Sequence, residues 1–268
     1  MLTKTEIHVV IEAGALRDAL NTVKHAVCRE QTRYYLVGVY LHYYDGALHF
    51  VATDGHRLAL AKVPAGEEYA NMPGVILPPN FVAAVCKAIP RRRAWQQSSL
   101  IVTPSKVTFL PPGEDATPIE CTPVDGTFPD YMRVIPSLDM VPEHGMIRAK
   151  TEDLKEAVAC VTAYREAVED HVPAVKLEIV GDTVTVSAKA SGNRNVDFRG
   201  ACAVAPLARE KLAPVCPAVG FNGRYLLDIL KAAKVADIEF RFYDVGGPNV
   251  FTVPLNPNVL FVLMPCRV

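Results

Sequence analysis

The order of predicted secondary-structure elements restarts halfway along the chain, and this repetition is the feature that most limits the possible folds. Residues 6–12 alternate like a strand, and residues 14–27 place apolar side chains at helical spacing. Residues 34–63 are rich in aromatic and β-branched residues, which predicts strands. A helix beginning near Pro79 and strands within residues 99–124 complete this half. We therefore expect two successive strand–helix–three-strand units, written βαβββ, in each half of the chain.

A segment rich in proline and glycine separates the two halves. Residues 125–145 contain three prolines and two glycines, a composition typical of a linker. We predict an N-terminal domain over residues 1–127, a linker over 128–144 and a C-terminal domain over 145–268.

The same order of elements follows the linker. Residues 151–164 predict a helix with Thr151 as its N-cap, and Gly181-Asp182 predicts a hairpin turn. A helix capped by Asn222 and two final strand regions follow. The predicted fold class is α+β, with antiparallel sheets on one side of each domain and two helices on the other.

Charge and hydropathy exclude several classes of protein. The 268 residues contain 28 Lys and Arg against 29 Asp and Glu, a formal net charge of −1. This balance argues against a protein that is basic over its whole surface, but it permits basic residues on one face. No apolar run approaches the roughly 18 residues of a membrane span, and the N-terminus lacks the pattern of a secretory signal. We expect a cytoplasmic protein without membrane contact.

Motifs for catalysis or metal binding are missing from the sequence. The seven cysteines are widely spaced and form no C-x-x-C pair, which argues against zinc and disulfides and favours small buried side chains in a reducing compartment. Asp54 and His56 are close enough to suggest an acid–base pair, but no G-x-S-x-G motif or phosphate-binding glycine loop accompanies them. We expect no enzymatic activity, no cofactor and no metal.

Basic residues recur on the polar faces of three of the four predicted helices. Any one such face is most simply explained as a solvated surface. Three basic faces in a neutral chain favour an anionic partner on the helical side. With neighbouring residues, the candidates for this surface are Arg17, Lys24, Arg29, Arg33, Lys87, Arg91, Arg224, Lys231 and Lys234.

Five segments resemble the bacterial DNA polymerase III β sliding clamp family, in the family's order and spacing. They are "RYYLVG", "VATDGHRLAL", "VDGTFPDYMRVIP", "FNGRYLLDIL" and "VLMPCRV". The resemblance covers the second and third of the family's three domains, and no part of the chain resembles the first. It implies two DNA-clamp-fold domains in a closed ring around duplex DNA, with the helices lining the hole and the sheets outside.

The resemblance also implies a peptide-binding pocket between the two domains. Its partners would be a DNA polymerase, a clamp loader and repair proteins, each carrying a short motif with a Gln and hydrophobic or aromatic anchors. Carried over to this chain, the pocket would include Leu36, Thr53, Gly55, His56, Arg57, Leu58, Pro129, Arg133, Val134, Asn222, Tyr225, Val262, Leu263, Met264, Pro265 and Arg267.

The residue types suit such a pocket on physical grounds. Gly55 permits a sharp turn and close approach of a peptide backbone. An adaptable apolar floor would come from Leu58, Val134, Leu263 and Met264. A polar rim would come from His56, Arg57 and Arg133. Taken without the resemblance, residues 259–268 indicate a core strand and residues 54–56 a loop.

Geometry favours three copies of a two-domain chain in a ring. A helix with its side chains is about 10 Å across, so twelve helices enclose a hole of roughly 28 Å and eight leave only about 15 Å. Duplex DNA is about 20 Å across, with major grooves roughly 8 Å deep. We therefore expect a head-to-tail homotrimer in preference to a dimer.

Two other interpretations remain open. The chain could be a monomeric adaptor or decoy that binds clamp-partner peptides without encircling DNA, although basic helical faces have no role in such a protein. An enzyme of nucleotide metabolism is a weaker alternative, which the missing catalytic motifs disfavour.

Overall fold

The structure is a computed structural model, and the residues that it describes fall into two units. It describes residues 6–113, 117–137, 146–168, 174–180, 183–188, 202–206, 218–241 and 246–267. Contacts divide the chain into Met1–Asp130 and Tyr131–Val268. The division follows Asp130, which lies inside the range 128–144 that the sequence assigns to a linker.

The first unit contains the βαβββ order twice, as the sequence predicts. Short 3-10 helices, η1 to η4, lie in the connections. The elements are β1 (Ile7–Glu12), α1 (Ala13–Val23), η1 (Lys24–Ala26), η2 (Gln31–Leu36), β2 (Val39–Tyr44), β3 (Ala47–Thr53), β4 (Arg57–Pro64), η3 (Glu67–Tyr69), β5 (Val75–Leu77), α2 (Pro79–Ala88), η4 (Arg91–Arg93), β6 (Gln97–Thr103), β7 (Lys106–Leu110) and β8 (Ile119–Cys121).

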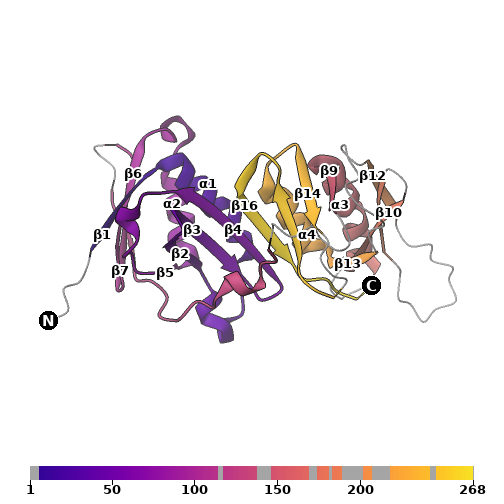
Figure 1. Cartoon of the computed structure of the whole chain (residues 1–268), viewed down its shortest axis with the longest axis horizontal. Coiled ribbons are helices and arrows are strands. Elements are labelled where there is room, and N and C mark those ends of the chain that lie inside the picture. Colours follow the sequence, from indigo (N-terminus) through magenta and orange to yellow (C-terminus); the bar gives the residue numbers. More distant parts are fainter. Residues whose placement is uncertain are drawn as a thin grey trace. The chain divides into compact units, whose positions relative to one another are not determined.

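Each repeat in the first unit gives its first strand to the sheet of the other repeat. Strand β1 pairs with β6, and β6, β7 and β8 continue the same antiparallel sheet. Strand β5 pairs with β2, which continues through β3 to β4. Because of this exchange, neither repeat can complete its sheet alone. Figure 1 shows β2, β3 and β4 in one sheet with α1 and α2 beside it.

Local sequence signals explain how these elements begin and turn. Helix α1 buries Leu16, Leu20 and Val23, and it packs against β3 and β4. Helix α2 begins at Pro79, whose fixed φ suits the first helical turn. The β2–β3 turn lies at Asp45-Gly46, where both residues have positive φ (48° and 73°). Such a turn matches the twist of a hairpin, as predicted.

The segment that follows β8 is attached to the first unit by backbone and aromatic contacts. The backbone N–H of Val124 donates to the carbonyl of Ile76 at 2.9 Å. The ring of Phe128 stacks on Tyr40 with a centroid distance of 4.8 Å, and Tyr40 also stacks on His42. His49 of β3 is paired with His42 of β2. Burial is the main cause that lowers the pKa of His49 to about 4.

The second unit has the same order of elements. They are η5 (Tyr131–Val134), β9 (Met146–Lys150), α3 (Thr151–Val168), β10 (Ala174–Val180), β11 (Thr183–Ser187), β12 (Cys202–Pro206), β13 (Val219–Asn222), α4 (Gly223–Ala233), β14 (Asp237–Arg241), β15 (Asn249–Val253) and β16 (Asn256–Leu263). Strand β13 pairs with β10 of the other repeat, and β9 pairs with β14. The exchange of first strands therefore recurs.

One helix cap in the second unit is confirmed and one is wrong. The Asn222 side chain accepts hydrogen bonds from the first-turn amides of α4. Thr151 is the first residue of α3 and does not cap it. Its buried hydroxyl has no hydrogen-bond partner among the described residues, and its backbone N–H donates to the carbonyl of Ala236. The predicted turn at Gly181-Asp182 lies outside the described residues.

The structure describes the side chains of five cysteines, which are free and differ in exposure. Cys28 is buried, Cys86, Cys121 and Cys266 are half-buried, and Cys160 is exposed on α3. The expectation that most cysteines are buried is therefore wrong for those described. Burial raises the pKa of the Cys121 thiol to about 11.

Helix length and hydropathy bear on membrane insertion. Among the described residues, no helix is both long enough and apolar enough to cross a membrane.

Candidate functional site

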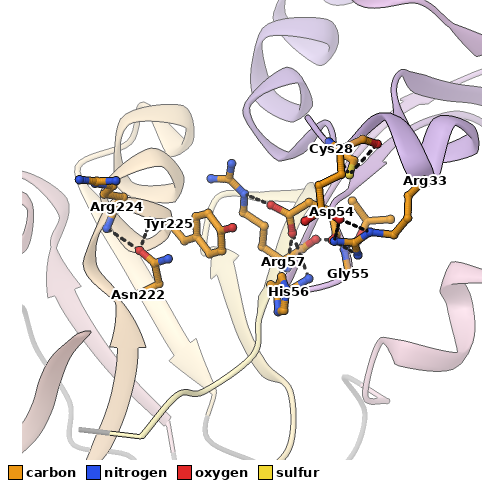
Figure 2. Close-up of polar contacts among 11 residues, drawn as sticks. Cys28, Arg33, Asp54, Gly55, His56, Arg57, Asn222, Arg224 and Tyr225 are labelled. Carbon is orange, nitrogen blue, oxygen red and sulfur yellow. Dashed lines mark hydrogen bonds and ion pairs between the residues drawn. The ribbon is translucent and has the colours of Figure 1, made fainter. Parts of the chain in front are cut away.

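The turn between β3 and β4 is held by the carboxylate of Asp54. Its Oδ1 accepts hydrogen bonds from the backbone N–H groups of His56 at 2.9 Å and Arg57 at 3.1 Å. Its Oδ2 accepts one from the Nε of Arg57 at 3.0 Å (Figure 2). The side chains of Asp54 and Arg57 are only 11% and 5% exposed. Asp54 therefore fixes the shape of the turn and neutralises a buried guanidinium.

Thr53 and Gly55 complete this turn. The Thr53 hydroxyl donates to the carbonyl of Arg57 at 2.7 Å and accepts from the backbone N–H of Gly55 at 3.1 Å. Gly55 has a φ of 86°, which is unfavourable for residues with a side chain. A Cβ at this position would lie 2.7 Å from Nη1 of Arg33. Two separate constraints therefore favour glycine here.

Arg33 supports the turn from η2. Its Nη1 donates to the backbone carbonyl of Asp54 at 2.7 Å (Figure 2). Its Nε donates to the carboxylate of Glu30 at 2.9 Å. The hydrogen bond to Glu30 raises the pKa of the Arg33 guanidinium. Arg33 was predicted to face DNA, but its guanidinium is instead bonded to Glu30 and the turn.

These contacts favour a structural role for Asp54 over a catalytic one. A catalytic carboxylate needs an oxygen that can reach a substrate proton. Both oxygens of Asp54 are bonded within the turn. Arg57, predicted as part of a polar rim, is buried because it pairs with Asp54. Gly55 and His56 are the exposed residues of this turn.

The remaining predicted pocket residues of the first unit differ in exposure. Leu36 and Leu58 are 5% and 2% exposed and belong to the core. Thr53 is half-buried, and Pro129 is exposed. Leu58 can therefore support a binding surface from below, but it offers little surface of its own.

In the second unit, the cap of α4 and the end of β16 hold several predicted pocket residues. The Oδ1 of Asn222 accepts from the backbone N–H groups of Arg224 at 3.0 Å and Tyr225 at 3.4 Å (Figure 2). Tyr225 is half-buried. The backbone N–H of Cys266 donates to the carbonyl of Gly220 at 2.8 Å, which ties the residues after β16 to β13.

The predicted apolar pocket residues of the second unit are divided between core and surface. Val262 and Leu263 are 3% and 0% exposed, whereas Met264 is 38% exposed and Val134 is 49% exposed. Pro265 is half-buried, and Arg133 and Arg267 are exposed. Sequence reasoning missed Met132, which is 40% exposed and lies in η5 with Val134. Its presence inside the segment "PDYMRVIP" was the available signal.

Four of the predicted DNA-facing residues of the first unit are exposed: Lys24, Arg29, Lys87 and Arg91. Arg17 departs from the expectation. Its side chain is 19% exposed, its Nε lies 3.5 Å from Asp18, and its Nη1 donates to the carbonyl of Ile89 at 3.4 Å. Arg17 therefore links α1 to the end of α2 and offers only part of its charge to solvent.

The three predicted basic residues of α4 and its C-cap are exposed: Arg224, Lys231 and Lys234. Arg224 forms an ion pair with Glu166 of α3, so part of its charge is neutralised. Lys234 has a φ of 49°, which ends the helix. Lys231 and Lys234 are the stronger candidates for an anionic partner.

A metal site in a protein needs several ligating side chains close together. In the described part of the chain, no group of three or more His, Cys, Asp or Glu side chains could hold a metal ion.

Comparison with known proteins gives one consistent family. Residues 10–130 match the family model of the DNA polymerase III beta subunit, central domain. The chain is 32% identical over 274 residues to a beta sliding clamp of Caulobacter vibrioides, covering 97% of this chain and 66% of the relative. It is 31% identical to a beta sliding clamp of Rickettsia felis, covering 93% of this chain and 64% of the relative. The chain thus spans about two thirds of the length of these curated relatives.

Solved structures agree with the sequence comparison. The beta sliding clamp of Caulobacter crescentus, with PEG bound to a putative beta-motif tethering region, matches with a TM-score of 0.82 and 31% identity. The match covers 100% of this chain and 67% of that one. A sliding clamp from Bartonella birtlesii bound to griselimycin matches with a TM-score of 0.80 and 30% identity, covering 97% and 66%.

Proposed function

Because the chain belongs to the bacterial DNA polymerase III β sliding clamp family, we propose that it acts as a sliding clamp on duplex DNA. In this proposal it tethers a polymerase to DNA without catalysing a reaction, in the cytoplasm. The observation that carries it is a set of exposed cations on three of the helices. Lys87 lies on α2, Lys231 lies on α4 and Lys24 lies directly after α1, in a chain whose net charge is only −1.

The charge distribution suits binding by enclosure. Lys87 and Lys231 lie on helices that bury their opposite faces, so their ammonium groups are available to phosphates. Contacts to phosphates carry no sequence information, and weak contacts allow movement along the duplex. A ring keeps its hold on DNA by topology, so it needs only a modestly basic lining.

A ring built only from copies of these 268 residues is proposed to contain three of them. Each copy contributes four helices, α1 to α4. Twelve helices about 10 Å wide enclose a hole of roughly 28 Å, which admits a duplex of about 20 Å. Eight helices leave roughly 15 Å and exclude it. A solution mass near twice that of the monomer would contradict this stoichiometry.

Retention on closed circular DNA tests the sliding-clamp proposal. We expect protein loaded on a nicked circle to be retained during gel filtration and to be lost once the circle is linearised, because a ring slides off free ends. Neutralising Lys24, Lys87 and Lys231 to Gln should reduce retention about tenfold, with a larger loss at higher salt. The control is Lys106→Gln, which removes a charge paired with Glu120 on a hairpin.

Other outcomes of this experiment point to other functions. Equal retention on circular and linear DNA would indicate an ordinary DNA-binding protein and would contradict enclosure. A protein that never loads but binds clamp-partner peptides would instead be the monomeric adaptor.

We also propose that the exposed apolar side chains of the second unit bind partner peptides. Met132, Val134 and Met264 are each at least 38% exposed. Flexible methionines adapt to different hydrophobic anchors, and the neighbouring Arg133 can orient a peptide backbone or carboxylate. The expected ligand is a short peptide with one Gln and aliphatic or aromatic anchors.

Fluorescence anisotropy of a labelled peptide tests this surface. We expect Met264→Glu to weaken binding at least about tenfold, because a buried charge replaces an apolar contact. The matched control is Leu255→Glu, since Leu255 is 97% exposed in the turn between β15 and β16 of the same unit. Equal weakening by the two variants would contradict a specific apolar surface.

A further inference from the structure

Trp95 is the single tryptophan of the sequence, and it lies on the surface close to two exposed arginines. Its side chain is 73% exposed in the connection between η4 and β6. Arg91 and Arg92 of η4 are also exposed, and neither forms an ion pair with any residue that the structure describes. The stretch 89–97 contains three arginines and no acidic residue. An exposed indole thus lies within a local excess of positive charge.

Backbone hydrogen bonds fix this connection against the start of α1. The N–H of Gly14 donates to the carbonyl of Ala94 at 2.7 Å, and the N–H of Ala13 donates to the carbonyl of Gln96 at 2.9 Å. Added bulk at Gly14 would collide with this contact, because a Cβ there would lie 2.9 Å from the carbonyl oxygen of Ala94. Trp95 therefore projects from a well-anchored turn.

Arg93 ties the connection between η4 and β6 to a second segment of the first unit. Nη1 of Arg93 donates to the carbonyl of Pro112 at 3.0 Å, in the connection between β7 and β8. Arg93 is thus used structurally, which leaves Arg91 and Arg92 as the exposed cations.

The indole also has a restricted orientation. Its Nε1 donates to the backbone carbonyl of Arg92 at 3.2 Å. The polar edge of the ring is therefore occupied, while most of the ring remains in contact with solvent. What this side chain offers to a ligand is the face of an aromatic ring, three and four residues along the chain from the exposed Arg92 and Arg91.

We propose that Trp95, Arg91 and Arg92 form a binding site for single-stranded nucleic acid, in which an unpaired base stacks on Trp95. Stacking uses the ring face and tolerates any base, and the guanidinium groups contact the adjoining phosphates. Bases inside a duplex are already stacked on each other and cannot use an indole in this way. The site therefore distinguishes single strands from duplex, which the basic helical faces do not.

A protein partner fits these observations less well. An interface tryptophan commonly uses its N–H to bind the partner, and here that N–H is already bonded within the turn. An acidic peptide would satisfy the arginines but has no need of an exposed ring face. The site does not depend on ring closure, so it can fail while the proposed clamp function stands, and the reverse also holds.

Intrinsic fluorescence gives a direct test because all tryptophan emission comes from Trp95. The whole chain is titrated with a short oligothymidylate and, separately, with a duplex of equal length. We expect saturable quenching by the single strand, weaker binding as salt increases, and little quenching by the duplex. Equal quenching by both would overturn the proposal in favour of a general phosphate-binding surface. The absence of quenching would overturn it outright.

Variants separate stacking from charge. Binding is measured by the anisotropy of a labelled oligothymidylate. Trp95→Ala should bind about tenfold to a hundredfold more weakly than the unaltered protein, and Trp95→Phe should bind with an affinity between the two. Arg91→Gln with Arg92→Gln should reduce the dependence of binding on salt. Lys106→Gln, in the hairpin between β6 and β7, should bind like the unaltered protein.

Self-association is the remaining competing explanation for an exposed tryptophan. Emission that changes on dilution without any nucleic acid, together with unaltered oligothymidylate binding by Trp95→Ala, would assign the residue to an interface between copies of the chain. That result would overturn the proposed base-stacking site. The outcome of this test is independent of whether the protein encircles DNA, because the oligothymidylate is short and linear.

Discussion

Replacing Asp54 with alanine is expected to lower the free energy of unfolding of the first unit by about 3–5 kcal/mol. The substitution removes the carboxylate that pairs with the buried Arg57 guanidinium at 3.0 Å. It also leaves the backbone N–H groups of His56 and Arg57 without their acceptor. The Arg57 guanidinium and the Arg57 amide are buried, so losing their partner is costly because water cannot readily replace it.

Urea unfolding followed by the fluorescence anisotropy of Trp95 measures this effect, since Trp95 lies in the first unit and its ring is held in the folded turn by Nε1. The matched control is His56→Ala, because His56 is an exposed residue of the same turn. We expect the control to change stability by no more than about 0.5 kcal/mol. Equal midpoints for the two variants would show that Asp54 does not hold the turn.

Replacing Phe251 with alanine is expected to lower the free energy of unfolding of the second unit by about 3–5 kcal/mol. Phe251 is fully buried, and its ring centroid lies 4.5 Å from that of Phe240 and 5.9 Å from that of Phe221. Alanine would leave a cavity among aromatic side chains that stand on paired strands and cannot collapse inward easily. Lost contacts and the cavity both contribute to the cost.

Two probes together locate the effect of Phe251→Ala. Far-UV circular dichroism reports both units, whereas tryptophan fluorescence reports the first unit alone. We expect an early loss of ellipticity while the fluorescence transition changes little. Leu255→Ala is the control, because Leu255 is 97% exposed. A fluorescence transition that moves as far as the circular dichroism transition would show that the two units unfold together.

Features set by neighbouring residues were predictable from the sequence. Apolar periodicity located α1 through Leu16 and Leu20, and the positive φ values that a tight hairpin requires located the turn at Asp45-Gly46. The Asn222 cap was predictable because its acceptor reaches amides only two and three residues away. The family and the α+β class were also predictable, because five ordered motifs span both halves of the chain.

Several side-chain roles were not predictable, because they depend on partners far along the chain. Arg33 has the charge of a DNA contact, but its guanidinium reaches the carbonyl of Asp54, twenty-one residues away. Arg17 of α1 likewise donates to the carbonyl of Ile89, seventy-two residues away at the end of α2. Arg57 differs from these two, because its partner Asp54 is only three residues away. Its expected place on a rim was wrong because the pairing depends on the conformation of the β3–β4 turn.

The sequence by itself determined the repeated βαβββ order, the family, the turn at Asp45-Gly46 and the positions of the basic helices, because hydrophobic period and turn chemistry act over a few residues. Only the tertiary structure decided that each repeat gives its first strand to the other, since strand pairing is chosen by contacts between distant segments. It also decided which cations remain free for a ligand. A guanidinium binds whichever carbonyl or carboxylate the fold brings within about 3 Å, and a linear sequence does not contain that distance.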